Sequence, residues 1–453
     1  MHKNYEIQRS FMEAAPVHPK AKEFEMIDQI LDANPNIYNL AFQDLTANTA
    51  SHHGANGMSA EQVVRAALVK RIEQCSYEDL SFHLSDSRTY RKFCKIGLVD
   101  KPFKKSALHK NIKALSAQTW EEINRVILEY AAKKEIEDGR KVRIDCTVIE
   151  SNIHAPYDSE LLWDSVRVLN RLLGRAKENL PGISFPYSDR TRRAKRRALN
   201  VTNAKTSKAR NTAYKDLIKV TNQVIAYSKS ALPEIESYPA VDILQSSIIL
   251  DLVKKLEHYL PLALKVVDQT ERRIIHGESV PSGEKIVSIF EDHTDIIKKD
   301  RRDTYYGHKI CLTGGPSNLI LDCLILDGNP ADSNLTGEML DRMSEIYGRY
   351  PKKAALDGGF ASKENVDKAK ANGVKDICFA KGKGLEVDNM CKSKYVFNKL
   401  RNFRAGIESG ISWLKRSFEL TRCLWKGLDS FKSYVWSSIV SANLLTIARK
   451  QIS

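Results

Sequence analysis

The sequence predicts a mixed α/β protein with a helical N-terminal block and a second helical block inserted after the first strand. A run rich in β-branched residues at 141–150 is typical of a buried central strand. Strand patterns then stop until about residue 285, after which strand and helix patterns alternate. We therefore expect three parts, which are a helical N-terminal domain over 1–135, a catalytic sheet domain over 136–160 and 280–453, and a helical insertion over 161–279.

The charge balance points to a polyanionic partner. The chain has 453 residues, with 71 Lys and Arg against 56 Asp and Glu, and a net charge of +15 at pH 7. Nucleic acid is the first expectation and a membrane surface the second. No apolar run is long enough to span a bilayer, and the first residues lack the apolar core of a signal peptide. The eight cysteines are scattered without zinc-ligand spacing, so we expect reduced thiols in an intracellular protein.

The sequence predicts short helices in the N-terminal block. Ser59–Gln62 is a capping-box pattern ahead of an amphipathic helix, and Ser76 opens a second helix. A third helix begins near Ser106, after a basic segment, and presents Lys110 and Lys113. Three short helices with a basic last one are typical of a helix-turn-helix DNA reader. An all-helical domain with a charged exterior is the alternative.

The inserted block carries three coiled-coil-like apolar seams. These are Leu162, Val166, Leu169 and Leu173, then Leu217, Val220, Val224 and Tyr227, and last Ile249, Leu252, Leu256 and Leu260. The link between the first two seams is dense in cations with almost no acid beside them, and the density favours contact with a phosphate backbone over plain solvated surface. The expected contacts there include Arg192, Arg193, Lys195, Arg196 and Arg197.

The last part alternates strands and helices, which predicts a mixed sheet. Strands are expected at 285–290, 307–312, 319–326, 353–357 and 376–380. Helices are expected at about 334–348, shortly after residue 359, and last in the segment that carries Glu408.

Charged side chains at three places in this plan suggest chemistry on a phosphodiester. On the last helix, Glu408 and Lys415 lie about 40° and about 20° around the axis from Arg404, so the three share one stripe. Asp145 and Asp357 each stand at the end of a strand-like run. Each place taken singly has an alternative explanation. The helix stripe could be a solvated face, Asp357 could belong to an ordinary Asp-Gly turn, and Asp145 could be a structural carboxylate. They do not explain the joint pattern.

In this order the residues resemble a DDE transposase of bacterial insertion sequences. Such enzymes carry a signature of Tyr, two residues, Arg, three residues, Glu, six residues and Lys, and Arg404, Glu408 and Lys415 meet its spacing. Arg401 stands where the family has Tyr. Phrases over 147–164 and 290–295, and the helical segment at 59–95, resemble the ISNCY-like group.

The resemblance implies a ribonuclease H-like mixed sheet with helices on both faces. It also implies an enzyme that binds the terminal inverted repeats of an insertion sequence, cleaves DNA and transfers the strand to target DNA. Asp145, Asp357 and Glu408 would be catalytic residues and ligands of two Mg²⁺ ions, for which Mn²⁺ can substitute. Arg404 and Lys415 would bind phosphates. Double-stranded DNA would be the partner of a homodimer or larger synaptic complex in the bacterial cytoplasm, at the nucleoid.

Two other functions stay open from the sequence. One is a ribonuclease H-like nuclease or resolvase that cuts branched DNA, which inverted repeats flanking the coding sequence would argue against. The other is a domesticated DNA-binding protein without chemistry, which an inert Asp145→Asn change would favour.

Overall fold

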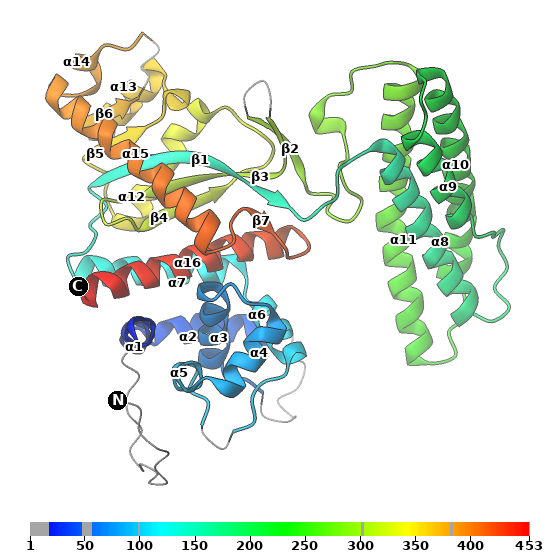
Figure 1. Cartoon of the computed structure of the whole chain (residues 1–453), viewed down its shortest axis with the longest axis horizontal. Helices are drawn as coiled ribbons and strands as arrows, with labels where there is room; N and C mark the ends of the chain where they lie inside the picture. The colour runs from blue at the N-terminus through cyan, green and yellow to red at the C-terminus, as the bar shows by residue number, and fades with distance from the viewer. Residues whose placement is uncertain (1–17, 48–56, 98–99, 300–302, 381–383, 453) are drawn as a thin grey trace, which may run out of the picture.

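The computed structural model describes residues 18–47, 57–97, 100–299, 303–380 and 384–452 (Figure 1). Seven helices precede the first strand. They are α1 (Pro19–Asp32), α2 (Asn36–Thr46), α3 (Ala60–Ile72), α4 (Tyr77–Asp86), α5 (Arg88–Phe93), α6 (Lys105–Ala114) and α7 (Ala117–Lys133). Among the described helices, none is long and apolar enough to cross a membrane.

The capping box predicted at the start of α3 is confirmed, and so is the helix start predicted at Ser76, where α4 also has a capping box. The Ser59 hydroxyl accepts from the Gln62 amide at 3.1 Å, and Ser76 does the same for Asp79. The amphipathic character predicted for α3 is wrong, because its residues from Val63 to Arg71 are all buried. One of its buried cations, the Arg65 guanidinium, pairs with acids of α1, and the Lys70 ammonium donates to the Cys75 carbonyl. The sequence analysis also missed α5, which lies between the second and third predicted helices.

The insertion is a bundle with its own apolar core (Figure 1). Its helices are α8 (Asp158–Asn179), α9 (Thr191–Thr202), α10 (Ser207–Glu236) and α11 (Ile243–Thr270), followed by the π-helical turn η1 (Glu271–Ile275). The three predicted seams face this core, with Tyr227 at its margin. The basic segment between the first two seams includes helix α9, in agreement with the helical character expected for the insertion. Ala194, Ala198 and Val201 bury one side of α9, which leaves its arginines toward solvent.

Seven strands form one mixed sheet. They are β1 (Lys141–Ser151), β2 (Asp295–Lys299), β3 (Asp303–Gly314), β4 (Ile320–Ile325), β5 (Lys353–Leu356), β6 (Asp376–Phe379) and β7 (Arg422–Cys423). The order is β2-β3-β1-β5-β6, with β4 paired to β3 and β7 to β1. β5 and β6 run parallel to β1, whereas β3 is antiparallel to it. The predicted mixed α/β class is confirmed.

One predicted strand is wrong. The segment at 285–290 follows the short turn η2 (Ser282–Glu284) without strand structure, and β2 begins only at Asp295. Ile286 and Ile289 are apolar because they pack into the core of the insertion. The Gln269 side chain bonds both the N–H and the carbonyl of Ile286, at 2.8 and 3.1 Å, and so supplies what a strand neighbour would.

Helices cover the sheet and join it to the N-terminal block (Figure 1). They are α12 (Thr336–Tyr347), α13 (Lys363–Ala371), the single turn α14 (Val387–Met390), α15 (Lys394–Ser417) and α16 (Leu428–Ile452), with 3-10 turns η3 (Asp332–Leu335) and η4 (Gly358–Phe360). α15 lies across β1, β5 and β6, while α12 packs against β4.

The prediction that α15 is the last helix is wrong, because α16 follows it and is buried along most of its length. α16 packs against α1, α3, α7 and β4. The Asn443 side chain accepts from the Ile320 amide at 2.9 Å and donates to Asn124 of α7 at 2.8 Å. The N-terminal helices and the sheet therefore share one apolar core, separate from that of the insertion.

Candidate active site

Two aspartates lie side by side because two neighbouring strands stop pairing at the same level. β1 pairs with β5 in parallel register only over Lys141–Ile144 and Lys353–Leu356. The next residues are Asp145 and Asp357. The sequence pattern suggested that Asp145 ends its strand. That prediction is wrong, because β1 continues to Ser151 alongside β3 and β7. The strand that ends there is the partner, β5.

Helix α15 brings the third carboxylate and a cation to the same place. The Arg404 guanidinium contacts Glu408 at 2.8 Å, and its Nη1 lies 3.5 Å from Asp357 Oδ1 and 3.8 Å from Asp145 Oδ2. Two metal ions and their ligand bonds would span about 8 Å between carboxylate oxygens. The two distances from Arg404 add to less than that, so Asp145 and Asp357 are close enough to share such a pair of ions. Three acids from distant segments thus surround one guanidinium.

Close packing of α15 on the sheet fixes this arrangement. A Cβ at Gly406 would lie 1.8 Å from Arg143 Nη1, and one at Gly314 would lie 2.9 Å from Ile407 Cδ1. A side chain at either glycine would force the Arg143 guanidinium or the end of the Ile407 side chain to shift. Gly406 lies between Arg404 and Glu408 along the helix, so this contact sets how far both side chains reach over β1.

The carboxylates open into a cavity of about 770 Å³. Its lining comes from β1, β2, β3, the ends of β5 and β6, and α15. It consists of Asp145, Cys146, Thr147, Val148, Ile297, Lys298, Lys309, Asn329, Asp332, Asp357, Ala380, Arg401, Arg404 and Glu408. Arg401, which replaces the tyrosine of the family signature, is therefore part of the cavity wall.

The donor set suits hard divalent cations, which prefer carboxylate oxygens. The three acids already converge on a positive group, Arg404, so the position favours a cation. Within the described residues, however, no three Asp, Glu, His or Cys side chains stand close enough together to hold a metal as they are. The guanidinium keeps the carboxylates apart, so a metal ion bound there requires Arg404 to move aside.

A second ion pair in the cavity was missed by the sequence analysis. Lys309 of β3 donates to Pro330 O at 2.7 Å and lies 2.6 Å from Asp332. A Cβ at Gly359 would meet Asp332 Oδ2 at 2.8 Å, so the acid lies against the loop that carries Asp357. The signal was Lys309 directly before the apolar run Ile310–Leu312, because a buried ammonium requires a partner.

Other predicted residues lie elsewhere. Lys415 is seven residues beyond Glu408 on α15 and does not line the cavity. Lys110 is exposed on α6, and Lys113 beside it lies 5.5 Å from the ring centre of Trp425.

The basic residues of α9 belong to the insertion. Arg193 and Arg197 pair with Asp216 of α10, so the expectation of almost no acid near these cations is wrong for those two. Lys195 lies over the Trp163 ring at 5.8 Å. Arg192 and Arg196 are exposed.

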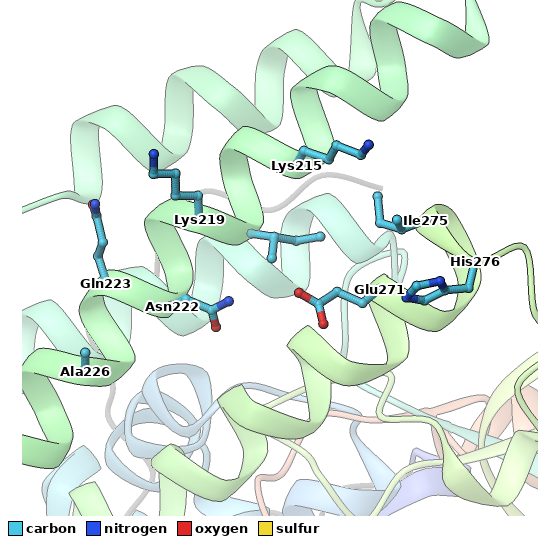
Figure 2. A pocket seen from close by; sticks show the side chains of 9 residues that line it. Lys215, Lys219, Asn222, Gln223, Ala226, Glu271, Ile275 and His276 are labelled. Carbon is cyan, nitrogen blue, oxygen red and sulfur yellow. The ribbon is translucent and has the colours of Figure 1, made fainter.

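A further cavity of about 670 Å³ lies in the insertion (Figure 2). α10 lines one side and the turn η1 the other, and Asn222 and Glu271 face each other across the opening. Lys215 and Lys219 stand on its α10 side. It shares no lining residue with the cavity that holds the three carboxylates.

Comparison with known families agrees with this geometry. A family model described as a transposase DDE domain matches residues 270–444, and one described as a transposase domain (DUF772) matches residues 13–114. Both matches are to transposase domains, and together they indicate a DDE transposase. No curated protein and no solved structure matches it.

The two matches cover different parts of the transposase. The DDE match contains Asp357, Arg404, Glu408 and Lys415 but not Asp145, because the insertion separates β1 from the rest of the sheet. Asp145 is therefore placed by geometry alone. Transposases of this family bind DNA, cleave it and transfer strands, and they generally depend on divalent metal ions. The mixed open sheet agrees with the ribonuclease H-like fold of such enzymes.

Proposed function

We propose that the cavity between β1, β5 and α15 is the active site for cleavage and strand transfer at the ends of an insertion sequence. The observation that carries the proposal is the meeting of Asp145, Asp357 and Glu408 around Arg404. Two Mg²⁺ ions, or Mn²⁺ in their place, would activate the attacking oxygen and stabilise the leaving oxygen there.

The chain's own residues take separate roles in this proposal. Asp145, on the central strand, would hold both metal ions, while Asp357 and Glu408 would each hold one. Arg404 leaves the carboxylates and turns its planar fork to a phosphate beside the scissile bond. Arg401, also in the wall, offers a second cation to the DNA, and Lys415 serves phosphates farther along α15.

DNA outside the cavity would be held by other basic surfaces. In the insertion these are Arg192, Arg193, Lys195, Arg196 and Arg197, and in the N-terminal block Lys110 and Lys113. The two ends of an element must be held together for transposition, so the working form is a homodimer or larger synaptic complex at the nucleoid. Membership of the ISNCY-like group belongs to the same proposal.

The test is cleavage and joining of duplexes that carry the native element ends, with and without Mg²⁺. Asp145→Asn keeps the size of the side chain and removes its charge, so it should lower both steps by at least about 100-fold while DNA binding in metal-free buffer is unchanged. Asp327→Asn, at an exposed position after β4, is the matched control. Full activity of the Asp145→Asn protein would reject the proposal, and cleavage without joining would indicate a nuclease.

A further inference from the structure

Three lysines come together on the face of the sheet that α15 covers. Lys141 begins β1 and Lys353 begins β5, and the two are register partners in the parallel ladder, so their side chains share one face. Lys399 comes from the first half of α15. We call Lys141, Lys353 and Lys399 the lysine cluster.

An aromatic ring and a buried arginine form the base of the cluster. The Lys141 ammonium lies 3.9 Å from the centre of the Phe403 ring, and the Arg143 guanidinium lies 4.9 Å from the same centre. Arg143 also donates to Asn318 at 2.6 Å and to the Phe403 carbonyl at 3.3 Å. These contacts hold Lys141 against α15 on the same side as Lys399.

The cluster carries positive charge that the protein does not neutralise. Among the described residues, no ion pair joins any of the three lysines to a carboxylate, whereas many other cations of the chain have such partners. Burial lowers the pKa of Lys141, and the charges of Lys353, Arg143 and Lys399 lower it further. The register partner of Lys353 on β6 is the buried Asp376, which accepts from the Lys392 amide and forms no ion pair with the cluster among the described residues. Like charges held together without an ion-paired acid favour binding of an anion.

The cluster lies in line with the proposed active site. Lys141 and Asp145 are four residues apart on β1, so their side chains share a face and their backbones are roughly 13 Å apart. Lys399 and Glu408 are separated by a similar length of α15. Along duplex DNA this separation corresponds to about four base pairs.

We propose that Lys141, Lys353 and Lys399 form a binding site for a phosphate of the DNA backbone, about four base pairs from the bond that is cut. The inference rests on the proposed function, because it takes the cavity beside Asp145 as the place where DNA is cleaved. Lysine ammonium groups are point charges that hold a phosphate without reading bases. The site therefore positions DNA of any sequence.

The experiment measures binding of the full chain to an element-end duplex in metal-free buffer at several salt concentrations. Lys353→Gln and Lys399→Gln should each weaken binding by roughly threefold to tenfold and lower the slope of log affinity against log salt by about 0.9. Lys353→Arg keeps the charge and should restore affinity. Lys254→Gln, an exposed position on α11, is the control and should change neither quantity.

Folding stability separates a binding site from a structural role. Because the lysines repel each other, Lys353→Gln should leave the melting temperature unchanged or raise it. A lower melting temperature together with the loss of affinity would overturn the proposal, as would normal binding and slope in both Gln variants. The assay needs no catalysis, so it fails or succeeds independently of the Asp145→Asn experiment.

Discussion

The cavity proposed as the active site and the surface of α9 both concentrate charge, but they do so in opposite ways. In the cavity, Asp145, Asp357 and Arg404 come from three segments more than forty residues apart, and both acids contact Arg404. On α9 the arginines are close neighbours in one helix, and Arg192 and Arg196 are exposed. A site made by packing depends on the whole fold, whereas a surface made by one segment depends on its composition.

The same contrast appears in the cores. The sheet shares its core with the N-terminal helices through α16, while the insertion packs on itself. The insertion is joined to the sheet through β1 before α8 and through the segment after η1. We therefore expect it to respond to mutation as a separate unit.

The largest expected effect tests that independence. Leu217 of α10 is fully buried in the insertion core, so Leu217→Ala should lower the unfolding free energy of the insertion by about 2–5 kcal/mol. Calorimetry should show one transition moved to lower temperature and the transition of the sheet unchanged. Val241→Ala, at a position that is 83% exposed, is the control. A single transition that moves as a whole would show that the two cores unfold together.

The next effect tests the α9 surface. Arg192→Gln combined with Arg196→Gln removes two exposed charges and should weaken duplex binding roughly tenfold, with a fall of about 1.8 in the salt slope. Arg193 and Arg197 already pair with Asp216, so the matching double change there should cost less DNA affinity. Cleavage of DNA already bound should be unaffected by either pair. Equal losses from both pairs would mean that exposure does not decide which arginines bind DNA.

The smallest effect lies at the junction of the two regions. Between β1 and α8, His154 contacts the Ala155 carbonyl at 3.0 Å and the buried Asp164 carboxylate at 2.8 Å. Burial alone would lower the pKa of His154, but these contacts outweigh it and raise the pKa above the usual value. Because the pKa of His154 is raised in the folded state, its protonation stabilises the fold. This stabilisation is fully present below the unfolded-state pKa and is lost as pH rises through the folded-state pKa.

Melting temperatures measured between about pH 5.5 and 8.5 should therefore fall slightly more with rising pH in the native protein than in His154→Ala. His258→Ala, at an exposed position on α11, should keep the native pH profile. If the melting temperature of His154→Ala depended on pH as that of the native protein does, His154 would not stabilise the junction between sheet and insertion.

Much of the fold could be predicted from local patterns. The run at 141–150, the apolar seams of the insertion, the capping box at Ser59 and the helix start at Ser76 each depend on neighbouring residues, and each has its expected structure. The failures have a common cause, which is packing from a distance. Ile286 and Ile289 look like strand residues but pack into the core of the insertion. α16 buries even its serines and Asn443, because it lies between the N-terminal helices and the sheet.

The sequence alone predicts which residues belong to the proposed site, because carboxylates and cations at family spacing are visible without coordinates. How these residues meet depends on the tertiary fold. The end of β5 beside Asp145 and the approach of α15 at Gly406 are contacts between distant segments, and so are the Lys309–Asp332 pair and the lysine cluster. Such contacts leave little trace in local periodicity, since it reports which face of an element is apolar and not what packs against that face.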